Sequence, residues 1–184
     1  RAEQLAPDSP ETYLALGWVK YAHREFGEAL AHFERAQSLR PSGDALQGIG
    51  FTLRRMGRLQ EALNHFQDAR RLIPHNYNLY FDGLGVTNTF LRRFDEAEQN
   101  INQALSLAPQ VSYGYLWKAH VLLARNGDIA GAKQVMLEIP RRANKAEAAE
   151  DEVTQGYMLT DELRILSETQ AELFDAFESG AIER

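Results

Sequence analysis

Large aromatic side chains and arginines recur along this chain at intervals that place them on one side of successive helices. Trp18 and Tyr21 are three residues apart, and Arg54 follows Phe51 at the same interval. Offsets of three, four and seven residues return to one face of an α-helix. Tryptophan, tyrosine and arginine dominate many protein interfaces, and a guanidinium can hold a carboxylate at two points. The candidate residues for contact with a peptide, here called the groove residues, are Trp18, Tyr21, Phe51, Arg54, Arg55, Val86, Phe90 and Trp117.

Packing between neighbouring helices is the alternative role for the largest of these side chains. The sequence favours groove contact for Trp18 and Phe51, and it leaves both roles open for Trp117. Arg54 and Arg55 are expected to pair with an acidic group on the bound peptide.

Residue patterns typical of catalysis are missing from the sequence. The five histidines include no His-Glu-x-x-His pair, and His32 and His65 occupy equivalent places in two repeated units. There is no Gly-x-Ser-x-Gly motif and no phosphate-binding loop. The chain contains no cysteine, which removes disulfide and zinc–thiolate chemistry. We therefore predict that the protein is not an enzyme and has no catalytic residue, cofactor or metal site.

The elements that must position the groove residues recur with a fixed period. Four prolines, at positions 7, 41, 74 and 109, follow one another at intervals of 34, 33 and 35 residues. Because proline cannot continue a helix interior, each one is expected to end the second helix of a helical hairpin. Small residues should mark the place where the two helices of each hairpin cross closely. These residues are Gly17, Gly50 and Gly85 on the first helices and Ala29, Ala62 and Ala97 on the second helices.

This pattern resembles the tetratricopeptide repeat, a pair of antiparallel helices of about 34 residues. The second unit, for example, carries Gly50, Ala62, Phe66 and Pro74 at the signature positions. The resemblance implies an all-α, right-handed superhelix with four repeats at residues 10–42, 43–76, 77–111 and 112–140. Residues 1–9 match the end of a preceding repeat, so the chain is expected to be a piece of a longer protein. Short strings around Arg54, Arg92 and Gly127 are similar to repeat arrays of bacterial signalling proteins.

The resemblance also implies a function. In this family the first helices line a concave surface that binds proteins. The resemblance therefore implies that the groove residues line a peptide-binding groove, and that the protein is a non-catalytic interaction scaffold within a larger multidomain protein. The clamp with which tetratricopeptide co-chaperones hold a terminal carboxylate is absent, because Leu14 and Gln47 occupy its lysine positions. A chaperone-tail adaptor is therefore not expected.

Charge and hydropathy restrict the class of partner. Residues 140–184 hold 11 acidic and 5 basic residues, which accounts for the net charge of −6 of the whole chain. The repeats are thus close to neutral and lack the basic stripe that nucleic-acid binding requires, so no nucleic-acid partner is expected. No apolar run is long enough for membrane insertion. The lack of cysteine does not separate cytoplasm from periplasm; the cytoplasm is favoured, and a targeting segment can lie upstream.

The C-terminal residues 141–184 are predicted to form an acidic helical cap. Leu159, Leu163, Leu166, Leu173 and Phe177 fall on one face of an amphipathic helix. Such a helix can cover the last apolar face of a repeat array. The alternative is that it acts as a regulatory module within the protein or joins two copies into a homodimer.

Overall fold

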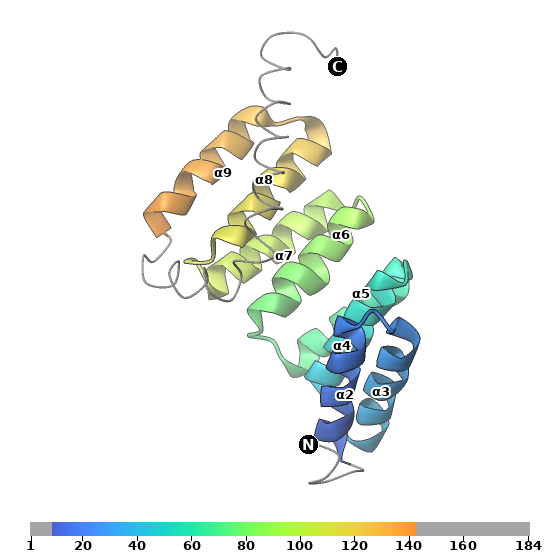
Figure 1. Cartoon of the computed structure of the whole chain (residues 1–184). Helices are drawn as coiled ribbons and strands as arrows, with labels where there is room; N and C mark the ends of the chain where they lie inside the picture. The colour runs from blue at the N-terminus through green and yellow to red at the C-terminus, as the bar shows by residue number, and fades with distance from the viewer. Residues whose placement is uncertain (1–8, 143–184) are drawn as a thin grey trace. The chain divides into compact units, whose positions relative to one another are not determined.

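The computed structural model describes residues 9–142, which form an all-α helical-repeat superhelix (Figure 1). Residues 1–8 and the predicted cap beyond Arg142 lie outside the described residues. The helices, in chain order, are α2 (Pro10–Ala22), α3 (Phe26–Leu39), α4 (Gly43–Arg55), α5 (Leu59–Leu72), η1 (Leu79–Val86), α6 (Thr87–Phe90), α7 (Phe94–Leu107), α8 (Ser112–Asn126) and α9 (Ile129–Arg142).

These helices form hairpins that pack against one another in chain order. Within hairpins, α2 packs on α3, α4 on α5, η1 on α7 and α8 on α9; between hairpins, α3 contacts α4, α5 contacts η1, and α7 contacts α8. The described residues therefore contain the four helical hairpins that the proline period predicts.

Side-chain caps define where the first helices of three hairpins begin. Ser9 Oγ accepts a hydrogen bond from the Thr12 amide at 3.1 Å, and Ser42 Oγ accepts one from the Ala45 amide at 3.1 Å. Asn76 Oδ1 accepts one from the Leu79 amide at 2.9 Å. Each bond satisfies an amide that has no partner within the first helical turn.

The third hairpin has one more residue than the first two between the cap and the crossing glycine. Gly17 and Gly50 lie eight residues after their caps, whereas Gly85 lies nine residues after Asn76. The helix accommodates the extra residue as the π-helical segment η1, which continues directly into α6. A π-helical turn holds one residue more per hydrogen-bonded ring than an α-helical turn, so the caps and the crossing can both keep their places.

The prolines end three of the four second helices. α3, α5 and α7 finish two residues before Pro41, Pro74 and Pro109. Pro140 does not stop the fourth one, because α9 continues to Arg142. A proline so close to the end of a helix removes only one backbone hydrogen bond, so the last turn can still form.

Left-handed backbone conformations close the turn inside each hairpin. Gly57 (φ 78°) and Gly127 (φ 69°) adopt them, as their residue type predicts. The equivalent residues of the other two hairpins are arginines, Arg24 (φ 62°) and Arg92 (φ 58°). Residues with a Cβ atom are strained in this region by about 1–2 kcal/mol, whereas glycine is not.

We expect the substitution Arg24→Gly to stabilise the protein by about 0.5–1 kcal/mol, because the strain it removes exceeds the entropy that glycine adds to the unfolded chain. Thermal unfolding followed by circular dichroism should show a higher midpoint. Gly57→Arg, the reverse change at an equivalent turn, should lower it. Equal midpoints for both variants would contradict this account of the turns.

The core is organised around two phenylalanines that lie between glycines of adjacent first helices. A Cβ atom on Gly17 or Gly48 would come within 2.6 Å of the Phe33 ring. Phe66 is held in the same way. A Cβ atom on Gly50 would lie 2.5 Å from its ring, and one on Gly83 would lie 3.0 Å from it. The glycines therefore create the space that each ring fills, both within its hairpin and towards the next one.

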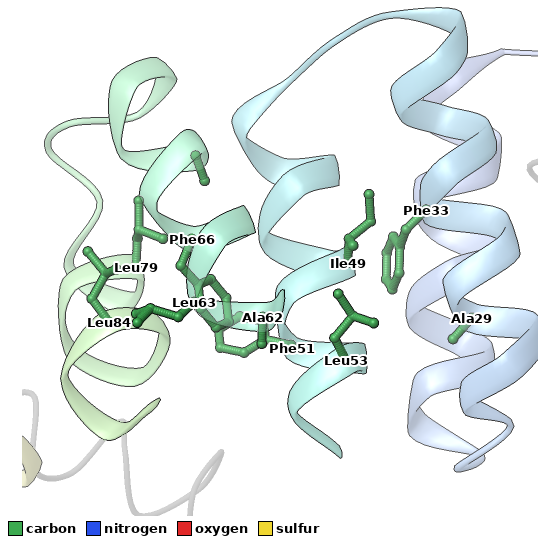
Figure 2. Close-up of a cluster of buried hydrophobic side chains, with 11 residues drawn as sticks. Ala29, Phe33, Ile49, Phe51, Leu53, Ala62, Leu63, Phe66, Leu79 and Leu84 are labelled. Carbon is green, nitrogen blue, oxygen red and sulfur yellow. The ribbon is translucent and has the colours of Figure 1, made fainter. Parts of the chain in front are cut away.

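The buried side chains form two clusters that meet at η1. The first cluster runs from α3 to η1 and contains Phe33, Phe66 and Leu84 (Figure 2). The second runs from η1 to α9 and contains Phe81, Ile101 and Val121. Because each helix contributes to the core of its neighbours, the stack holds the first helices in a fixed order and presents their exposed sides together.

Candidate peptide-binding face

The first predicted site residues, on α2, form an exposed aromatic group at the N-terminal end of the array. Trp18 is 39% exposed, and its ring centroid lies 5.6 Å from that of Tyr21 in an edge-to-face arrangement. On its inner side the indole ring contacts Phe33, with centroids 4.9 Å apart. Core packing therefore fixes the orientation of Trp18 while part of the indole remains accessible to a ligand.

Two predicted site residues, Phe51 and Val86, lie in the core. Phe51 is 9% exposed and packs edge-to-face on Phe66, with centroids 5.1 Å apart. Val86 is 4% exposed and belongs to the second buried cluster. These two side chains therefore support the face from below and offer little surface themselves.

Arg54 is engaged within the protein. Its Nη2 lies 2.7 Å from Asp82 Oδ1, and its Nη1 donates to the main-chain carbonyl of Asp82. The guanidinium also lies over the Phe51 ring, 5.2 Å from the centroid. The side chain is only 10% exposed. Arg54 thus links α4 to η1, and its hydrogen bonds stabilise the junction of the second and third hairpins.

Arg55 is more exposed and faces the opposite neighbour. Its Nε donates to the Tyr21 hydroxyl at 3.1 Å. This bond connects the end of α4 to α2 and places a positive charge beside the Trp18 and Tyr21 rings. The structure therefore brings Trp18, Tyr21 and Arg55 together.

The remaining predicted residues form a second aromatic group towards the C-terminal end. Phe90, at the end of α6, is 54% exposed and lies edge-to-face with Trp117 of α8 at 6.1 Å between centroids. The His120 ring lies 5.4 Å from Trp117 on its other side. Partial burial lowers the pKa of His120, so the imidazole is neutral near pH 7 and adds to the aromatic surface.

We call the exposed and half-buried side chains of these two groups the first-helix face: Trp18, Tyr21, Arg55, Phe90, Trp117 and His120. Sequence reasoning omitted His120 from the predicted site, although it lies three residues after Trp117 on the same side of α8. It also missed the role of Asp82 as the partner of Arg54, because the two residues are 28 positions apart in different repeats.

Other kinds of site find no support in the described part of the chain. Residues 9–142 contain no group of three or more histidine or acidic side chains placed to hold a metal ion. None of the helices formed by these residues is long and apolar enough to cross a bilayer.

Comparison with known proteins agrees with the helical hairpins described above. The family model of the tetratricopeptide repeat matches residues 43–110, which include α4 to α7. The fold is similar to the crystal structure of MamA, with a TM-score of 0.69 and 17% identity over 80% of this chain and 85% of that one. Residues 43–110 of the chain therefore match the tetratricopeptide repeat family.

Other tetratricopeptide-type structures and longer proteins also resemble the chain. The Cut9–Hcn1 hetero-tetramer of APC/C gives a TM-score of 0.66 at 18% identity, over 77% of this chain and 28% of that one. The human protein O-mannosyl-transferase TMTC3 is 22% identical over 67% of the chain, and the peroxisomal targeting signal receptor of Kluyveromyces lactis is 27% identical over 58%. The matches span only 15% and 19% of these two relatives. The shared fold is one that suggests a protein–protein interaction scaffold.

Proposed function

We propose that the chain is a non-catalytic scaffold that binds a peptide segment of a partner protein on its first-helix face. The observation that carries this proposal is the exposure of Trp18 and Phe90, two large aromatic side chains that the stacked core leaves partly uncovered. Large aromatic residues held rigidly by packing on one side are favourable binding contacts, because little side-chain entropy is lost when a ligand covers them.

The arrangement favours a peptide long enough to reach both aromatic groups. Trp18 and Tyr21 belong to the first hairpin, whereas Phe90 and Trp117 belong to the third and fourth. Apolar side chains of the ligand would cover the two groups, and the positive charge of Arg55 beside the first group would favour an acidic ligand. Arg54 has no such role in this proposal, since Asp82 already occupies it.

The names of two similar proteins are consistent with this role. One is called a receptor for the peroxisomal targeting signal, and another, Cut9, was crystallised as part of a hetero-tetramer with Hcn1. The first name describes binding of a targeting signal, and the second describes assembly with another protein.

The chain contains two tryptophans, and both lie on the first-helix face, which gives a direct test. Peptides selected from a random display library on the full chain should shift the intrinsic tryptophan emission when they bind. The double variant Trp18→Ala/Trp117→Ala has no tryptophan left to report binding, so its affinity is measured by fluorescence anisotropy of dye-labelled peptides. We expect it to bind them at least about tenfold more weakly, as expected for the loss of two interface aromatics.

The matched control is Leu72→Ala, which removes an exposed apolar side chain from the second helix α5. It should bind the selected peptides like the wild type. Peptides that bind the tryptophan variant and the wild type equally tightly would place the ligand elsewhere and refute the proposal.

A further inference from the structure

The turns inside the hairpins lie along one side of the described helices, where α4 gives way to α5 and α6 to α7 (Figure 1). The second and third of these turns are joined directly: Arg93 Nη2 donates to Gln60 Oε1 at 2.8 Å. We define the turn edge as Met56 and Phe90 together with Arg92 and Arg93, which lie at these two adjacent turns.

The turn edge carries positive charge that the described residues do not neutralise. Among residues 9–142, neither Arg92 nor Arg93 forms an ion pair; Arg93 donates to the Gln60 amide, and Arg92 lies over the Phe94 ring at 5.3 Å. Two guanidinium groups therefore remain without a counter-charge of their own in this part of the chain.

Carboxylates at the two turns are paired with other cations. Glu61 binds Arg58 at 2.6 Å, and Asp95 binds Arg125 at 2.9 Å. Glu96, in the first turn of α7, offers a single negative charge against the two arginines. The balance at the turn edge is positive.

Exposed apolar side chains lie at the same turns. Met56, which caps the end of α4, is 42% exposed, and Phe90 ends α6. Methionine adapts its shape to aliphatic and aromatic partners, so each of these two side chains can take up an apolar group of a ligand.

We propose that the turn edge binds an acidic, amphipathic segment of a partner protein. Carboxylates of that segment pair with Arg92 and Arg93, and its aliphatic side chains cover Met56 and Phe90. The proposal extends the proposed function, on which it rests in part, because Phe90 borders both the first-helix face and the turn edge. Nucleic acid is disfavoured because two guanidiniums displace few counterions and the whole chain has a net charge of −6.

The test uses the full chain and a fluorescent synthetic peptide of about 20 residues, with leucines at helical spacing and glutamates between them. A second peptide carries lysine in place of each glutamate. We expect the glutamate peptide to bind, with an affinity that falls as salt concentration rises, and the lysine peptide not to bind.

The variants separate the turn edge from the first-helix face. Arg92→Gln/Arg93→Gln should weaken binding of the glutamate peptide about tenfold and reduce its salt dependence. Arg70→Gln/Arg71→Gln makes the same charge change at the other end of α5 and should leave binding unchanged.

Met56→Ser should weaken binding without altering the salt dependence. Circular dichroism melts confirm that each variant is folded, and Arg92→Lys/Arg93→Lys, which keeps the charge, should retain most of the affinity.

Several results would overturn the inference. One is equal binding of the glutamate peptide by wild type and Arg92→Gln/Arg93→Gln. Another is that Trp18→Ala loses binding of the glutamate peptide while Arg92→Gln/Arg93→Gln keeps it. That result would place the peptide on the first-helix face and so support the proposed function alone. Tighter binding of a single-stranded oligonucleotide than of the glutamate peptide would assign the arginines to nucleic acid instead. If the library peptides bind Trp18→Ala/Trp117→Ala as tightly as they bind the wild type, that result refutes only the proposed function of the first-helix face.

Discussion

Replacing Phe66 by alanine is expected to lower the free energy of unfolding by about 3–5 kcal/mol. The ring is fully buried, and it lies against Gly50 of its own hairpin and Gly83 of the next one. It also packs edge-to-face on Phe51. Because glycines cannot fill the space that the ring leaves, the substitution creates a cavity between two hairpins.

Urea denaturation followed by circular dichroism measures the loss. Phe90→Ala is the matched control, since it removes the same side chain from an exposed position. Its effect should stay within about 1 kcal/mol. If the two substitutions lowered the unfolding midpoint equally, Phe66 would not be the residue that joins the hairpins.

The substitution Gly50→Ala should have the next largest effect, a loss of about 1–3 kcal/mol. The new methyl group would lie 2.5 Å from Cε1 of Phe66, which is closer than a carbon–carbon contact allows. Either the ring must leave its rotamer or the two helices must move apart. Gly27→Ala provides the control, because no atom lies within 4 Å of the added methyl group near the start of α3. There alanine should stabilise the helix by about 0.5–1 kcal/mol.

A double-mutant cycle separates the clash from a general effect on helix α4. Combined with Phe66→Leu, which shortens the apposed side chain, Gly50→Ala should cost less than it does alone. Strictly additive losses would show that the methyl group is harmful for a reason other than contact with the Phe66 ring.

The sequence predicts the hairpins well because their determinants are local. The proline period, the crossing glycines and the buried alanines depend on spacing within one unit, and the observed helices and burial follow it. Phe33 and Phe66 could be assigned to the core for the same reason. The domain limits of the repeats stay predictions, and so does the C-terminal cap.

Features that depend on the neighbouring repeat were harder to predict. Phe51 and Val86 share the helical face of Trp18 by spacing, yet the stacking of the next first helix buries them. Arg54 looks available for a ligand until Asp82 of the following hairpin is placed beside it. Arg24 and Arg92 adopt a conformation that their residue type does not favour, because the turn geometry of the repeat imposes it. Nearest-neighbour packing is therefore the information that a single unit lacks.

The extra residue in η1 has an evolutionary consequence. The interval from the crossing glycine to the closing proline is 24 residues in each of the first three units, whereas the interval from the cap to the glycine changes from eight to nine. Insertions and deletions can thus accumulate at the entrance of the first helix, where a wider turn absorbs them. Trp18 and Phe90 come after the glycine, so they keep their register when the entrance changes length. The length of a unit can in this way change without redesign of the proposed binding face.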